Sequence, residues 1–175
     1  MIMKHQELHT YTLEKRFGPV KNKIIKQDES FRMIHLVDSE DISRTMGIVQ
    51  FSVIKGEPLK EAHNKIRAGS KLGRTLLEHN IEFSKKYLGT IYVELPKWLQ
   101  QDFNSNAASS KAFLSQIMVQ SKEEKKPFLY ANLIEVIPNS IIDDFKAKNK
   151  LLSDLDSNWL SLVNHAGLKM FSYEE

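Results

Sequence analysis

The stretch FRMIHLVDSEDISRTMGIVQFSVI, residues 31–54, predicts a β-hairpin. Segments 31–38 and 46–54 are short, apolar and either β-branched or alternating, as strands are. DSEDIS between them has the composition of a turn. Strands joined by so short a turn pair antiparallel. The stretch therefore places an antiparallel sheet at the centre of the fold.

Further strands and helices flank this hairpin on both sides. The predicted strands are short and rich in β-branched or aromatic residues, and they lie at 20–27, 90–95, 112–120 and 127–137. The predicted helices begin at proline signals or show a helical apolar stripe, and they lie at 58–66, 72–83, 96–103 and in the tail from residue 139 onward.

This order of elements indicates an α+β fold with a single antiparallel β-sheet and helices packed on one face. The length of 175 residues favours one domain with one core. We therefore expect residues 1–138 to form the sheet domain and residues 139–175 to form a C-terminal helical extension of the same domain. Such a sheet can hold a ligand between its face and the covering helices.

The composition argues against several classes of partner. The formal net charge of +3 is too weak to predict nucleic-acid binding. No apolar run approaches the roughly 20 residues of a membrane helix, and the N-terminus lacks a signal-peptide pattern, so a cytoplasmic protein is expected. The chain has no cysteine, and its histidines, with His5 and His9 in a terminus expected to fray, show no metal-ligand spacing.

The alternation of the strand at 31–38 singles out one charged residue, Arg32. It shares a face with Ile34 and Leu36. Burying an unpaired charge is costly, so Arg32 either reaches solvent at a sheet edge or binds a carboxylate. The planar guanidinium is suited to the second role.

Two residues of the strand at 127–137 are further candidates. Glu135 shares a face with Leu133 and Ile137, so it either meets a cation, acts as a general acid, or faces water at the strand end. Asn132 lies on the opposite face and is a candidate polar anchor.

Segments spread along the chain are similar, in the same order, to the chorismate lyase family (chorismate–pyruvate lyase, or 4-hydroxybenzoate synthase). They are RMIHL at 32–36 with MGIVQF at 46–51, KLGR at 71–74 with HNIE at 79–82, YVELPKWL at 92–99, and KPFL at 126–129. Each segment is short, and their shared order over roughly residues 10–138 carries the resemblance.

The resemblance implies a chorismate lyase-like fold and the elimination of pyruvate from chorismate to give 4-hydroxybenzoate, without a cofactor or metal. It assigns catalytic roles to Arg32, which would bind the substrate carboxylate, and to Glu135, the family's acid. It places Gly47, Leu72 and Gly73 against the substrate. The implied partner is a small anionic aromatic or pre-aromatic carboxylate.

The chain departs from the family pattern at two places. Ungapped alignment from Lys126-Pro127 puts the family's glutamate at or beside Asn132, whereas alignment on its Glu-to-Pro ending gives Glu135. A slip of one residue changes the face, so both residues remain substrate-site candidates. The family's insert before Phe31 is reduced to residues 28–30, which implies a more open pocket.

These departures support a second class of function. UTRA domains, the ligand-sensing modules of transcription regulators, use the same fold to bind small molecules without reaction. The alternative prediction is therefore a non-catalytic binding protein for an aromatic carboxylate.

Overall fold

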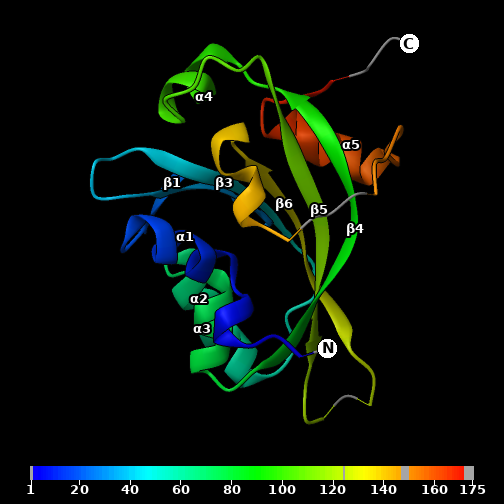
Figure 1. Ribbon diagram of the computed structural model, residues 1–175. Helices are drawn as coiled ribbons and strands as arrows, with labels where there is room; N and C mark the ends of the chain where they lie inside the picture. The colour runs from blue at the N-terminus through cyan, green and yellow to red at the C-terminus, as the bar shows by residue number, and fades with distance from the viewer. Residues whose placement is uncertain (1, 124, 147–149, 172–175) are drawn as a thin grey trace.

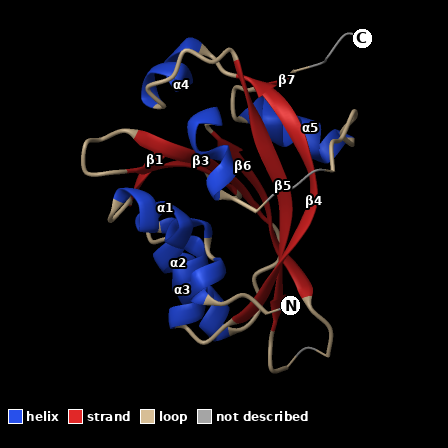
Figure 2. Ribbon diagram, in the orientation of Figure 1, coloured by secondary structure: helices blue, strands red, loops and turns tan. Residues whose placement is uncertain are grey.

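A computed structural model describes residues 2–123, 125–146 and 150–171, and one curled antiparallel sheet runs through its centre (Figures 1 and 2). The sheet order is β1-β2-β3-β6-β5-β4-β7, and each neighbouring pair is antiparallel. The strands are β1 (Lys21–Gln27), β2 (Phe31–Val37), β3 (Ser43–Phe51), β4 (Glu82–Glu94), β5 (Ser109–Gln120), β6 (Phe128–Ile137) and β7 (Lys169–Met170).

Helices lie before, between and after these strands. The α-helices are α1 (His9–Phe17), α2 (Glu57–Arg67), α3 (Leu72–Glu78), α4 (Lys97–Asp102) and α5 (Ser157–His165), and the 3₁₀ segments are η1 (His5–Glu7) and η2 (Asn139–Asp144). The prediction of an α+β fold around a single antiparallel sheet is confirmed.

The predicted hairpin forms between β2 and β3. Asp38 closes its turn, because the backbone N–H groups of Glu40 and Ile42 donate to the Asp38 carboxylate. β3 then pairs with β6 in the centre of the sheet, with Gly47 opposite Glu135. The register therefore aligns the side chains of β2, β3 and β6 that project from the same face of the sheet.

Both faces of the sheet carry helices, so the prediction of helices on one face only was wrong. The first face packs against α4 and α5 in a cluster that includes Met33, Met46, Ile48, Leu99 and Trp159. The second face packs against α2 and α3 in a cluster that includes Val49, Ile117, Ile66 and Leu76. Because strand side chains alternate between faces, two apolar faces require two helical layers. Arg32 lies on the second face.

The C-terminal extension is built into the sheet and its core. Trp159, Leu162 and Val163 of α5 are buried, and β7 pairs with the outer edge of β4. The extension is therefore only partly helical, and its residues 147–149 and 172–175 lie outside the described part of the chain. Glu124, between β5 and β6, also lies outside it.

Elements between α2 and β5 differ from the predicted boundaries. The helix predicted at 72–83 ends at Glu78, and the strand predicted at 90–95 begins at Glu82. The first part of this strand could not be recognised in the sequence, because Lys85 and Lys86 interrupt the apolar alternation that indicates a strand. The longer β4 is what carries Lys85 to the second face.

The first face contains a buried histidine, His35, whose exposed fraction is 1%. Its Nδ1 lies 2.6 Å from Ser43 Oγ. Burial lowers the pKa of His35 to about 4, although Asp102 nearby opposes the shift. The folded protein therefore keeps this ring neutral at pH values where an unfolded chain protonates it.

We expect His35 to make the protein less stable as the pH falls from 7 to 5. In this window the unfolded state gains a proton that the folded state does not, which removes about 2 kcal/mol of stability by pH 5. Urea unfolding of wild type and His35→Asn, whose amide can still bond Ser43, measures this. The stability gap between them should shrink toward pH 5, and parallel curves would contradict the assignment.

Candidate functional site

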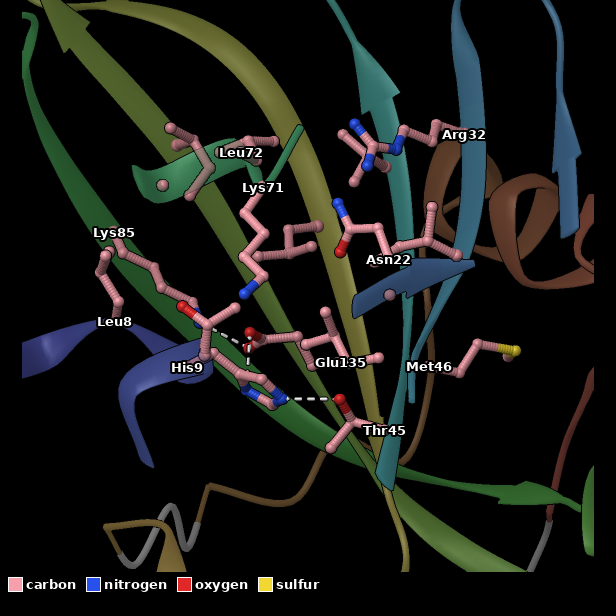
Figure 3. Close-up of a pocket in the computed structure, with 18 of the residues that line it drawn as sticks. Leu8, His9, Asn22, Arg32, Thr45, Met46, Lys71, Leu72, Lys85 and Glu135 are labelled. Atoms are coloured by element: carbon pink, nitrogen blue, oxygen red, sulfur yellow. Dashed lines mark hydrogen bonds and ion pairs between the residues drawn. The ribbon is translucent and has the colours of Figure 1, made fainter. Parts of the chain in front are cut away.

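One pocket lies between the second face of the sheet and the segments that cover it (Figure 3). Its walls come from six strands, β1 to β6, from the start of α3 and from the N-terminal segment. The apolar part of the lining includes Ile34, Leu36, Val49, Ile117 and Leu133. The cavity volume is about 110 Å³, and one water needs about 10–15 Å³ on this measure. The space suits a ligand the size of one substituted ring.

Arg32 lines one end of this pocket and is 1% exposed. Its Nη1 donates to the backbone oxygens of Ile66 and Ser70, and its Nη2 donates to Ser70 O at 3.1 Å. These carbonyls belong to the end of α2 and to the link that follows it. Within the described part of the chain, no carboxylate forms an ion pair with Arg32.

The electrostatics at this end favour an anion. Burial lowers the pKa of Arg32 to about 10, with Tyr130 opposing the shift and Arg67 adding to it. Arg32 is therefore still protonated at neutral pH. Carbonyl oxygens solvate the guanidinium but carry no net charge that could balance it. A ligand carboxylate would supply that charge.

The pocket floor is set by strand register. Gly47 lies directly between Ile34 and Glu135 on neighbouring strands, and its missing side chain leaves open space beside the glutamate. Arg32 and Glu135 lie on the same face, with β3 between their strands, which separates their backbones by roughly 10 Å across the sheet. Their side chains approach the pocket from opposite ends.

Glu135 occupies the other end and is 5% exposed. Its Oε2 accepts from Lys85 Nζ at 2.5 Å, and its Oε1 lies 3.0 Å from His9 Nδ1. Lys85 lies on β4, and His9 is the first residue of α1. A carboxylate held by two neighbours has a fixed direction, and it can accept or return a proton in the cavity.

The start of α3 closes one side of the pocket, where Lys71, Leu72 and Gly73 line it. Lys71 Nζ pairs with Glu14 of α1 at 2.7 Å, and Arg74 pairs with the same carboxylate at 2.6 Å. Burial raises the pKa of Glu14, but hydrogen bonds and charge from Lys71 and Arg74 outweigh burial and hold it below its usual value. These ion pairs fasten α1 over the pocket.

Gly73 permits the close approach of the N-terminal segment. A Cβ at this position would lie 2.6 Å from Leu8 Cδ2, closer than real side chains come. Met3, Leu8, His9 and Thr10 thereby complete the pocket wall. The short connection before β2 predicted a more open pocket, yet the N-terminal segment covers the space instead.

Five of the candidate residues from the sequence line this single pocket: Arg32, Gly47, Leu72, Gly73 and Glu135. Asn132 is not among its lining residues. Its side chain donates to Gln50 and accepts from Gln116, and it projects from the face opposite that of Leu133. The register thus brings Glu135, not Asn132, to the cavity.

Sequence reasoning missed several polar residues of the pocket. His9 was expected in a frayed terminus, but it begins α1 and contacts Glu135. Asn22 also lines the pocket; its Nδ2 donates to Gly69 O at 2.8 Å, and its buried Oδ1 has no donor among the described residues. Asn22 follows Val20 by two residues, and this spacing could have indicated that both side chains lie on the same face of the strand. No local signal marked His9.

Comparisons with known proteins assign no family: no family model matches the chain, and no curated protein is a significant match. Among the described residues, no cluster of three or more histidine, cysteine, aspartate or glutamate side chains could hold a metal ion. None of the described helices is long and apolar enough to cross a membrane.

We expect Gly47→Ala to weaken ligand binding without unfolding the protein. The added Cβ would contact Ile34 at 3.5 Å, an ordinary distance, so stability should change by less than about 1 kcal/mol. If a small aromatic carboxylate binds in this pocket, the methyl group would fill space beside Glu135 and lower its affinity about tenfold. Calorimetry measures the affinity. Asn132→Ala, outside the pocket, is the control, and equal losses in both variants would place the ligand elsewhere.

Proposed function

We propose that this protein is a chorismate lyase-like enzyme that eliminates pyruvate from chorismate to give 4-hydroxybenzoate. The observation that carries the proposal is a buried guanidinium, Arg32, which lacks a carboxylate partner among the described residues and shares a small apolar pocket with Glu135. The resemblance of the sequence segments to the chorismate lyase family supports the same reading.

The reaction needs an anion anchor and one proton carrier. The bond between a ring carbon and the ether oxygen breaks, and the neighbouring ring carbon loses a proton, so that its C–H electrons complete the aromatic ring. The leaving enolpyruvate takes up a proton and becomes pyruvate. No electron acceptor is required. We assign the proton transfers to Glu135, which can take the ring proton and return it to the leaving group.

The other pocket residues would bind and orient the substrate. Arg32 would hold the ring carboxylate with its two parallel N–H donors. Gly47, Leu72 and Gly73 would form the slot for the ring. The buried Oδ1 of Asn22 could accept a hydrogen bond from a ligand hydroxyl. Holding the ring and the proton carrier in one geometry would lower the entropic part of the barrier.

A specific observation favours the second candidate, a non-catalytic binding protein of the UTRA type. Glu135 already pairs with Lys85 and His9. A network of this kind needs no catalytic role, because it satisfies the hydrogen-bonding groups of a buried carboxylate. In that case the pocket would bind an aromatic carboxylate through Arg32 and release it unchanged.

Pyruvate release from chorismate separates the two candidates. We expect purified protein to form pyruvate, detected with a coupled dehydrogenase, and Glu135→Gln to lower the rate at least about a hundredfold because the amide cannot carry the proton. Glu82→Gln, an exposed residue elsewhere, is the control. No pyruvate above background at micromolar enzyme would remove the catalytic proposal.

Binding can be tested without turnover. At a hundred times its Kd, 4-hydroxybenzoate should add about 2.7 kcal/mol of stability, which raises Tm by roughly 5–10 °C. Arg32→Lys should lose most of this shift, because an ammonium cannot make two parallel bonds to a carboxylate. Arg67→Lys is a matched control, since Arg67 also donates to backbone carbonyls but lies outside the pocket. An undiminished shift in Arg32→Lys would show that the anion binds elsewhere.

A further inference from the structure

The N-terminal helix brings one side chain, that of His9, into direct contact with Glu135. His9 begins α1, and its side chain is 12% exposed. The ring stacks on Phe145, just after η2, with 4.6 Å between the ring centres. Two separate elements, α1 and the segment after η2, therefore hold this imidazole at the end of the pocket opposite Arg32 (Figure 3).

Both ring nitrogens of His9 have partners, and together they determine where its proton lies. Nδ1 is 3.0 Å from Glu135 Oε1, and an ionised carboxylate can only accept hydrogen bonds. Nε2 is 2.9 Å from Thr45 Oγ1, and a hydroxyl can donate as well as accept. In the neutral ring, Nδ1 must therefore carry the hydrogen, and Thr45 must donate to Nε2.

Lys85 completes this arrangement from the other side of the carboxylate, since its Nζ donates to Oε2 of Glu135. The remaining charged groups that line the pocket are Lys71 at the start of α3 and Arg32 on β2. Lys71 is paired with Glu14, and Arg32 is held by backbone carbonyls. His9 and Lys85 both bond Glu135 in the described structure.

We propose that His9 is a positioning residue for Glu135 and that α1 is a functional part of the site. His9, in the tautomer with hydrogen on Nδ1, fixes Oε1 of the carboxylate and so sets the direction of the carboxylate relative to the cavity. Glu135 selects that tautomer, because its carboxylate can only accept, and Thr45 satisfies the other ring nitrogen by donating to Nε2. The effect on turnover rests on the proposed lyase function, whereas the tautomer and its dependence on Glu135 do not.

Nitrogen-15 spectra of the imidazole test the hydrogen-bond scheme without any ligand. In the spectrum of the neutral ring, we expect the His9 signal to show a protonated Nδ1 and an unprotonated Nε2. Glu135→Gln should convert this to a mixture of tautomers, because the amide can donate as well as accept. A signal with the hydrogen on Nε2, or one that Glu135→Gln leaves unchanged, would overturn the proposal whether or not chorismate reacts.

Two substitutions at His9 separate its contacts in the turnover assay. The amide of His9→Asn occupies about the place of Nδ1 and can still donate to Glu135, whereas the longer His9→Gln places its amide near Nε2 and loses that contact. We expect kcat for pyruvate release to fall no more than about threefold in His9→Asn and at least tenfold in His9→Gln. KM should change little in either, because Arg32 supplies the binding.

His5→Asn, in the exposed η1 segment outside the pocket, is the matched control and should leave kcat unchanged. Equal losses in the Asn and Gln variants of His9 would show that the ring only packs on Phe145, and would overturn the positioning role. If wild type releases no pyruvate while the spectra show the expected tautomer, the lyase proposal fails and the hydrogen-bond scheme stands.

Discussion

The buried guanidinium of Arg32 is the constraint on which the arrangement of this molecule depends. A charge removed from water must be solvated by the protein, and here the solvating groups are the carbonyls of Ile66 and Ser70. Those carbonyls can reach β2 only if α2 ends above it and the chain turns there toward α3. The same contact therefore positions the segment from Lys71 to Gly73, which forms one wall of the pocket. Solvation without charge compensation leaves one end of the cavity electropositive.

The two faces of the sheet differ in character because side chains alternate between faces along each strand. One face of β2 and β3 carries Met33 and Met46, and the apolar side of α5 packs against it. The other face carries Arg32 and the glycine at position 47, and the helices that cover it leave a cavity. A stable layer behind the sheet thus holds rigid the strands that present the polar groups. Functional sites built on strands are held more precisely than sites on loops.

Much of the sheet could be predicted, because its signals are local. The alternation in residues 31–37 placed Arg32 on a face with Ile34, and the strand at 127–137 placed Glu135 with Leu133. The cover of the pocket could not be predicted in the same way. HTYTLEKRF has a weak apolar stripe and no capping side chain, so α1 owes its place to tertiary contacts such as the Glu14 ion pairs. The α5 layer was expected as a helix, but which face it covered depended on strand order. Long-range pairing of this kind leaves no trace in a short window of sequence.

The uncompensated end of the pocket also makes the protein sensitive to the salt in which it is studied. Chloride, acetate, sulfate and phosphate are all small enough to approach a guanidinium, and a partly enclosed charge is screened less by the bulk electrolyte than a surface charge. Each such ion would compete for Arg32 with the organic acid proposed to bind there. Apparent affinities would then depend on buffer chemistry as well as ionic strength, and a weakly bound organic acid assayed in concentrated phosphate would be mistaken for a molecule that does not bind.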